Sequence, residues 1–292
     1  FDDLLVGARN EDTSSSQAGR TRIYRGSSEG IVSSSPWDFA GVEVGELLGQ
    51  ALGGNGDLNG DGVVDLIVSS PGRDLDGVVS IFHGAPTWPE AGPTQTIAGG
   101  TFDNEFAGAI APMRDVDGDG LADMVLGVDA AEASGGLLAA GAAVFAPGSL
   151  GDVTLGARRE GTEPVVRFGD RVLFLGDAHH EMTAYAVVSA PFEDQGGVED
   201  VGRAYVVPID ASGPLWSSST ILVGEEGGFG NHLWAGDFNG DGLEDLAVAA
   251  PFYGGELGRV YIFAGARGGV STTPTMTLDG IRTPGAFGTI AP

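Results

Sequence analysis

The sequence predicts an all-β fold, a β-propeller of four-stranded antiparallel blades. Short aliphatic runs bounded by turn residues recur along the chain, and an acidic nine-residue loop recurs with them. No segment shows the 3.6-residue period and caps of a helix, and residues 131–143, the nearest case, are better explained as a loop and a strand. Tandem four-stranded units without helices suit radial stacking around an axis.

The most regular element is a loop with oxygen-bearing side chains at positions 1, 3, 5 and 9 and glycine at position 6. Its three intact copies span residues 57–65, 115–123 and 237–245. From Asp57 to Asp115 is 58 positions, and from Asp115 to Asp237 is 122, close to twice that. A degraded copy at 177–185 lies near the midpoint, which indicates a repeat of about 60 residues.

A strand-length apolar run follows each loop. The runs span residues 65–71, 123–129, 185–191 and 245–251, and the chain opens with a fifth at 3–9. The residue at the fifth position of each run is small: Gly7, Ser69, Gly127, Ser189 and Ala249. Small side chains are what a strand needs where several sheets crowd together, so these runs are expected near the centre of the assembly.

Three more strands complete each unit. One opens with glycine, at residues 19–26, 77–84, 141–148, 202–209 and 258–265. A weaker strand follows, as at 94–98, 219–223 and 275–279. A Phe-Gly-like pair leads the strand before each loop: Leu48-Gly49, Phe106-Ala107, Phe168-Gly169, Phe229-Gly230 and Phe287-Gly288. The cation loop therefore joins the first and second strands of a unit.

These units predict one domain over residues 1–292. The approximate repeat units are 1–41 (with 281–292 as its first strand), 42–100, 101–160, 161–224 and 225–280. The two chain ends then form halves of one blade, and the C-terminal strand closes a ring of five. If the chain is a fragment, the parent ring is larger, for example with seven blades.

Composition excludes several classes of function. The chain has no Lys, and its 14 Arg stand against 41 Asp and Glu, a net charge of −27 that repels phosphates. Nucleic acid and anionic membranes are therefore poor partners. Without Cys there are no disulfides or thiol chemistry. No stretch of about 18 apolar residues is present. No signal peptide is visible, and an upstream leader is the alternative, because residue 1 already lies inside a repeat.

The three intact loops predict about three Ca²⁺ sites. Ca²⁺ takes six to eight oxygen ligands, and glycine permits the sharp turn that gathers them. Backbone carbonyls at position 7 should complete each shell. The expected ligands are Asp57, Asn59, Asp61, Val63 and Asp65; Asp115, Asp117, Asp119, Leu121 and Asp123; Asp237, Asn239, Asp241, Leu243 and Asp245. An acidic turn without metal is one alternative. An EF-hand is another, disfavoured because no helices flank the loops and no Glu stands at position 12.

With the Phe-Gly pair and the small-residue strand, this loop resembles the FG-GAP repeat, as found in integrin α-subunit propellers and many secreted bacterial proteins. The resemblance covers essentially the whole chain. It implies a Ca²⁺-stabilised propeller, extracellular or on the cell surface and used in adhesion or recognition. The family's ring usually has seven blades, against five units here. Residues 177–185 depart from the loop pattern, so no Ca²⁺ site is carried onto them.

The sequence offers no convincing catalytic constellation. His179-His180-Glu181 is more consistent with a decayed cation loop than with a Zn²⁺ or acid–base cluster, because neighbouring histidines point in divergent directions on an extended loop. His83 and His232 are isolated, so packing or surface roles are expected. We therefore predict a protein that is not an enzyme, with the propeller domain of a lipid- or polysaccharide-degrading enzyme as one alternative.

Several other side chains leave two interpretations open. Trp37, Trp88 and Trp216 are assigned to the connections between third and fourth strands. There they either present sugar platforms or, as we favour, pack against blades. The pair Arg158-Arg159 and Arg167 either face a ligand or form local salt bridges.

The leading functional hypothesis is a binding or adhesion module for protein or polysaccharide. Antiparallel connectivity places the cation loops on one face and the loops between second and third strands on the other. Variable loops on a rigid scaffold usually carry recognition, so the ligand is expected on the face opposite the cations. We expect a monomer, with a strand-exchanged oligomer or a structural repeat segment of a larger surface protein or fibre as alternatives.

Overall fold

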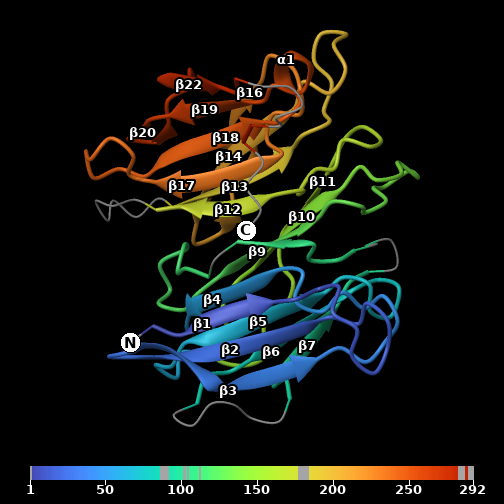
Figure 1. The fold of residues 1–292 in the computed structure, drawn as a ribbon. Coiled ribbons are helices and arrows are strands. Elements are labelled where there is room, and N and C mark those ends of the chain that lie inside the picture. Colours follow the sequence, from blue (N-terminus) through green and yellow to red (C-terminus); the bar gives the residue numbers. More distant parts are fainter. Residues whose placement is uncertain are drawn as a thin grey trace.

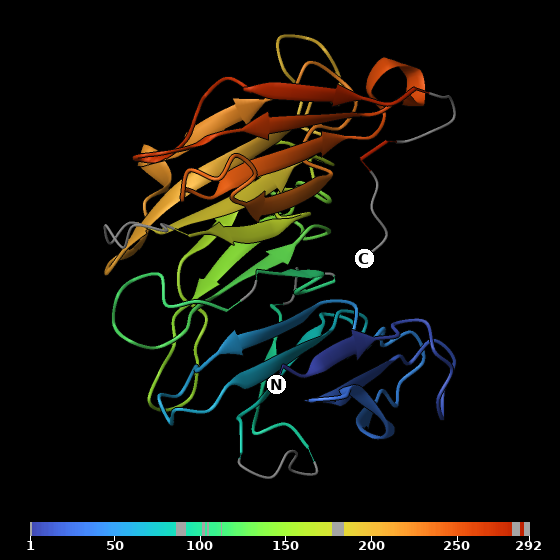
Figure 2. The same cartoon turned by 60° about the vertical axis from the view of Figure 1, so that its left-hand side comes forward.

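The computed structural model describes residues 2–85, 92–100, 103, 105–111, 113–176, 184–281 and 287–288. These residues form an all-β fold in which five sheets follow one another in chain order, from the blue N-terminal sheet to the red C-terminal sheet (Figure 1). Figure 2 shows the same sheets running from the red C-terminal sheet at the top to the blue N-terminal sheet at the bottom. The predicted fold class is confirmed: the sheets are antiparallel blades of a β-propeller.

The first three sheets contain strands β1 to β11 in sequence order. Their bounds are β1 (Leu4–Gly7), β2 (Arg20–Ser27) and β3 (Gly30–Ala40); β4 (Leu52–Gly56), β5 (Asp65–Ser70), β6 (Val78–Phe82) and β7 (Gln95–Ala98); β8 (Ala109–Ile110), β9 (Met124–Val128), β10 (Ala142–Ala146) and β11 (Arg158–Glu160). In the second and third sheets the cation loop joins the first two strands, as the sequence predicts.

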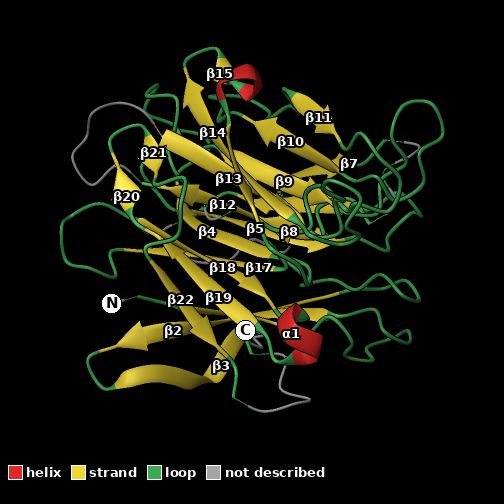
Figure 3. Ribbon diagram, turned by 90° about the horizontal axis from the view of Figure 1, so that it is seen from above, coloured by secondary structure: helices red, strands yellow, loops and turns green. Residues whose placement is uncertain are grey.

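The last two sheets repeat this order and add short hairpins. Their strands are β12 (Val172–Leu175), β13 (Ala184–Ala190), β14 (Arg203–Asp210), β15 (Gly213–Pro214) and β16 (Thr220–Val223); β17 (His232–Gly236), β18 (Asp245–Ala250), β19 (Arg259–Phe263) and β22 (Met276–Asp279), with β20 (Gly265–Ala266) pairing β21 (Gly269–Val270). Helical structure in the described residues is confined to the single turns η1 (Trp216–Ser218) and α1 (Tyr253–Glu256), red in Figure 3.

The first sheet has three described strands, β1, β2 and β3. The C-terminal strand predicted to complete this sheet includes residues 289–290, which lie outside the described residues. Ring closure therefore stays a prediction. Within the described part of the chain, no helix has the length and apolar character needed to cross a bilayer.

Hydrophobic cores lie between neighbouring sheets rather than within one. Strand β5 is buried along its whole length and contributes to two of these cores, with Val68 facing the first sheet and Ile67 facing the third. Further cores join the third sheet to the fourth and the fourth to the fifth. A blade buries its apolar faces only against neighbouring blades, so each sheet depends on the next for stability.

The small fifth position of the second strand is explained by a close approach of backbones. A Cβ added to Gly127 would lie 2.0 Å from the carbonyl oxygen of Gly169, in the next sheet. A Cβ on Gly7 would likewise lie 2.1 Å from the oxygen of Gly49. The predicted crowding of sheets at this position is confirmed, and it is the Phe-Gly pair of the following blade that fills the space.

That pair forms a latch between blades. Leu48 N–H donates to Ala18 O of the first sheet at 3.0 Å, while Gly49 N–H donates to Ser69 O of its own sheet at 2.8 Å. Phe168 and Phe229 repeat the first bond, at 3.0 Å to Ala140 and 3.1 Å to Val201. Each aromatic or leucine side chain is buried in the core between the sheets. The latch thus joins backbone and core contacts at one point.

Two of the three notable tryptophans can be assigned. Trp37 lies within β3, so its assignment to a connection before the last strand is wrong, because β3 runs on to Ala40. Its ring packs edge-on to Phe82 at 5.0 Å between the first two sheets. Trp216, in η1, packs against Phe168 at 5.8 Å between ring centroids. The packing interpretation is confirmed for both, and Trp88 lies outside the described residues.

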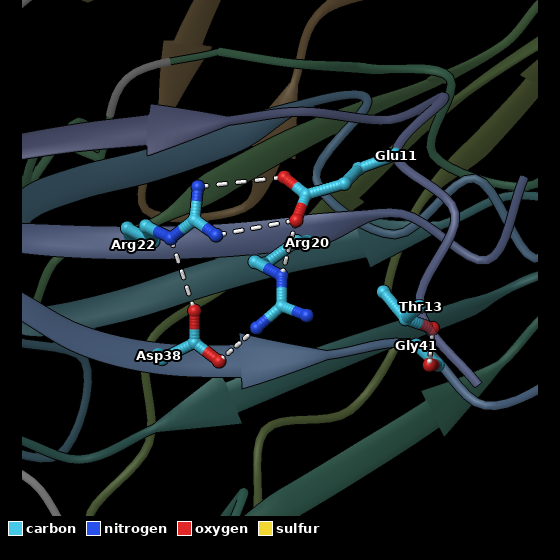
Figure 4. A network of polar contacts seen from close by, with 6 residues as sticks. All are labelled: Glu11, Thr13, Arg20, Arg22, Asp38 and Gly41. Atoms are coloured by element: carbon cyan, nitrogen blue, oxygen red, sulfur yellow. Dashed lines mark hydrogen bonds and ion pairs between the residues drawn. The ribbon is translucent and has the colours of Figure 1, made fainter.

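An ion-pair network stiffens the first sheet. Arg20 and Arg22 on β2 each bridge Glu11, in the loop after β1, to Asp38 on β3 (Figure 4). Thr13 of the same loop donates to Gly41 O at 2.7 Å. The loop that leaves β1 is therefore held to the last strand of its sheet.

Gly127→Ala is expected to destabilise the fold by about 1–3 kcal/mol, because the new methyl group must displace backbone rather than a flexible side chain. Gly54→Ala is the matched control: nothing lies within 4 Å of its added Cβ, and it should change stability by less than about 0.5 kcal/mol. Urea unfolding followed by tryptophan fluorescence measures both. Equal, small effects would contradict the close approach of the sheets.

Candidate metal centres and the opposite face

The three acidic loops share one hydrogen-bonded conformation. In the first, Asp57 Oδ1 accepts Gly60 N–H at 2.7 Å and Asp57 Oδ2 accepts Gly62 N–H at 2.7 Å. Asp61 then accepts the N–H of Val63 at 2.8 Å. The loops that begin at Asp115 and Asp237 repeat these bonds. The side chains at positions 1 and 5 therefore fold inward over the loop.

The carboxylate at position 9 has a structural role that the sequence did not reveal. Asp65 is buried, and its Oδ2 accepts Leu58 N–H at 2.7 Å while its Oδ1 accepts Gly84 N–H at 2.7 Å. Asp123 and Asp245 make the equivalent pairs of bonds. Each side chain thus ties its loop to the end of the third strand, besides its predicted role as a ligand.

The second loop gathers enough carboxylate to hold a cation. Oxygen atoms of Asp115, Asp117 and Asp123 all lie within 4.8 Å of one another. Burial raises the pKa of Asp123 to about 6, although Val116 and Gly148 donate backbone hydrogen bonds to it, and the charges of Asp117 and Asp119 raise this pKa further. A bound cation would relieve both burial and repulsion, so this donor set fits a hard cation such as Ca²⁺.

The other predicted ligands are placed less completely. In the first and third loops position 3 is Asn59 or Asn239, whose amide nitrogen donates to the position-5 carboxylate at 3.0 or 2.9 Å. Asp119 is not part of the three-carboxylate group. The position-7 carbonyls of Val63, Leu121 and Leu243 stay predicted ligands. The degraded loop, with His179, His180 and Glu181, lies outside the described residues.

The remaining isolated side chains have packing or ion-pair roles. Ring centroids of His232 and Trp234 are 5.7 Å apart in a stacked pair, and burial, then the charge of Arg171, lowers the pKa of His232. Arg158 pairs with Asp103 at 2.6 Å, and Arg159 lies 5.3 Å from the centroid of Trp216. The salt-bridge interpretation is confirmed for Arg158.

On the face opposite the acidic loops lies a cavity of about 300 Å³. It lies where the first strands of the blades begin and the second strands end. As an individual residue, only Arg167 of this cavity was singled out from the sequence. Its lining comes from four successive sheets: Arg9 and Asn10; Leu47 and Gln50; Glu105, Gly108 and Asp129; Arg167, Asp170 and Arg171. Most of these residues stand directly before or after a Phe-Gly pair. The positions of those pairs in the sequence could therefore have identified them.

Comparison with known proteins supports the family suggested by the repeat. A model of the FG-GAP repeat matches residues 229–263, which include a Phe-Gly pair, an intact acidic loop and the two strands after it. Residues 229–263 thus match an FG-GAP repeat. The blades predicted from the sequence and seen in the sheets agree with this match.

Relatives of this FG-GAP chain include integrin α-8 of Homo sapiens, 29% identical over 205 residues, which are 65% of this chain and 18% of that protein. Integrin α-PS5 of Drosophila melanogaster is 41% identical over 106 residues, 35% of this chain and 10% of that protein. Phosphatidylinositol-glycan-specific phospholipase D of Mus musculus is 35% identical over 131 residues, 40% of this chain and 15% of that protein. The chain thus spans less than a fifth of the length of each.

Asp65→Ala should destabilise the FG-GAP domain by about 2–4 kcal/mol even in the presence of a chelator, because two backbone N–H groups lose a charged acceptor. Asp61→Ala is the matched control. Asp61 is exposed in the same loop, and its loss should cost less than about 1 kcal/mol without metal. Urea unfolding in chelator compares the two. Similar small losses would mean that position 9 has no role apart from metal binding.

Proposed function

We propose that this FG-GAP propeller is an extracellular or cell-surface binding module of adhesive type, stabilised by Ca²⁺ at about three loops. The observation that carries the proposal is the second loop, where three carboxylates converge. The third loop lies within the matched FG-GAP repeat. The first and third loops share its hydrogen bonds. The proposed ligands are the fifteen residues of these three loops named from the sequence.

The metal's role in this proposal is structural. Each loop joins the first two strands of a blade, and its ninth residue is tied to the end of the third strand. A cation held there would fix three strand ends relative to one another. Protein oxygens would fill most of the shell, which leaves little room for a polarised substrate.

The ligand in this proposal is a protein or polysaccharide that binds the face opposite the acidic loops. Two features favour that face as the ligand-binding surface. The loops after the second strands project from it, and the polar cavity is lined by residues next to the strand ends on that face. We propose a monomer that binds neither nucleic acid nor the membrane interior, in line with its net charge of −27.

Saturating Ca²⁺ is expected to raise the melting temperature, because it binds the folded loops and not the unfolded chain. The gain should be about 1–3 kcal/mol per site for a Kd of about 10⁻⁴–10⁻³ M. Thermal melting with Ca²⁺, with Mg²⁺ and with chelator measures the effect, and elemental analysis counts bound metal. An unchanged melting temperature with no bound metal refutes the Ca²⁺ part of the proposal.

One observation favours a second candidate, the propeller part of a lipid-cleaving enzyme: the match to phosphatidylinositol-glycan-specific phospholipase D covers 40% of this chain. The test is turnover of a glycosylphosphatidylinositol-anchored substrate and of a glycan panel by the purified chain. The binding-module proposal expects no turnover. Turnover that disappears in His180→Ala or Glu181→Ala would replace it with the enzyme.

A further inference from the structure

The polar cavity on the face opposite the acidic loops is formed jointly by four sheets. It has a volume of about 300 Å³, and its lining residues lie beside the first and second strands of these sheets. Three of the chain's 14 arginines, Arg9, Arg167 and Arg171, line it. Three acids, Glu105, Asp129 and Asp170, line the same cavity, so its lining is of mixed charge. It still brings three guanidinium groups together in a chain of net charge −27.

Two of these arginines are held by acids buried behind them. Arg167 Nη2 lies 3.1 Å from Asp170 Oδ1 and also pairs with Asp129, while Arg171 Nη1 lies 3.2 Å from Asp170 Oδ2. The Asp170 side chain is 3% exposed, whereas those of Arg167 and Arg171 are 39% and 42% exposed. Asp170 is thus a positioning residue. It fixes two guanidinium groups whose remaining N–H donors are accessible.

These contacts leave one carboxylate oxygen of Asp170 without a hydrogen bond. Its Oδ2 is buried and receives no hydrogen bond within the described residues, since the contact with Arg171 is an ion pair without hydrogen-bond geometry. Burial raises the pKa of Asp170, and the charges of Arg171 and Arg167 oppose that rise. Burial of this carboxylate costs folding free energy, which is consistent with a role in orienting the two arginines.

Arg9 differs from Arg20 and Arg22 of the first sheet. Arg20 and Arg22 form ion pairs with Glu11 and Asp38, as Figure 4 shows. Arg9 is exposed and donates through Nη1 to the neutral Oε1 of Gln50 at 3.2 Å. Its charge is therefore directed to the cavity without a carboxylate partner among the described contacts.

We infer that this cavity binds a carboxylate, presented by an acidic side chain of a partner protein, through Arg9, Arg167 and Arg171. Guanidinium groups pair with carboxylates in planar, charge-assisted contacts, and three arginines line this one small space. None of the described lining residues is aromatic, so the cavity offers no platform for stacking a sugar ring. The inference rests on the proposed binding function and names the ligand chemistry at its centre.

The most specific test removes one acidic or one basic side chain from the cavity lining and compares the effects on binding. Glu105 lines the same cavity, is exposed, and acts electrostatically on Arg167. Glu105→Gln should strengthen binding of a carboxylate about threefold, while Arg9→Gln should weaken it about fivefold. A cationic ligand would reverse both signs. Arg267→Gln is the matched control, because it removes one charge from the exposed β20–β21 turn on the other face.

The probes are a short blocked peptide with one glutamate and the same peptide with glutamine, and titrations are followed by the Nε–H signals of arginine in NMR spectra. We expect binding of the glutamate peptide only, weakened in Arg9→Gln, strengthened in Glu105→Gln and unchanged in Arg267→Gln. Each variant's melting temperature in Ca²⁺ checks that it is folded. A trigalacturonate arm tests a polysaccharide carboxylate as the alternative source.

Three outcomes overturn the inference: no binding of the glutamate peptide, equal binding of both peptides, or binding that Arg9→Gln and Glu105→Gln leave unchanged. Binding of trigalacturonate in preference to the peptide overturns the protein source. These failures are distinct from failure of the proposed function. If Ca²⁺ still raises the melting temperature while no carboxylate binds, the metal part of that proposal stands and the cavity has another ligand.

Discussion

The structure depends on the close approach of backbones where one blade meets the next. At three of these points the pair donates one N–H to the preceding sheet and one to its own: Leu48-Gly49, Phe168-Gly169 and Phe229-Gly230. The preceding sheet can accept this only where it has glycine or another small residue. Gly141, with a φ of 79°, combines both demands, since an added Cβ would lie 2.2 Å from Phe168 O. Side chains are excluded there by geometry, not by polarity.

This contact also separates the two faces of the molecule. The latches bring the beginnings of the inner strands together, so residues beside them, such as Gln50 and Asp170, meet around one cavity. The acidic loops lie at the other ends of the same strands, and the first also accepts backbone hydrogen bonds from the third sheet, through Asp57 O and Leu58 O. In the proposed function, a cation would bind at the loop ends of these strands, and a ligand at the cavity would contact four sheets. The proposal thus places stabilisation and recognition at opposite ends of the same strands.

Much of the fold follows from the sequence because its signals are local and repeated. The nine-residue loops, the strands opened by glycine and the small fifth position all recur at one spacing, and β5, β9 and β18 lie where the runs after the loops predict them. Other features could not be predicted. The anchoring role of Asp65 depends on Gly84, 19 residues away, and the cavity depends on residues as distant as Arg9 and Arg171. Trp37 was misassigned because β3 runs further than its weak pattern indicates.

The central claim is that the latches join neighbouring sheets into one cooperative unit. Hydrogen exchange of the amides of Leu48, Phe168 and Phe229, measured by NMR across a denaturant series, tests it most directly. We predict that these amides exchange only through global unfolding, with the same free energy and denaturant dependence as the amides of β5 and β13. Exchange of the latch amides at markedly lower free energy, with the strands still protected, would contradict the account.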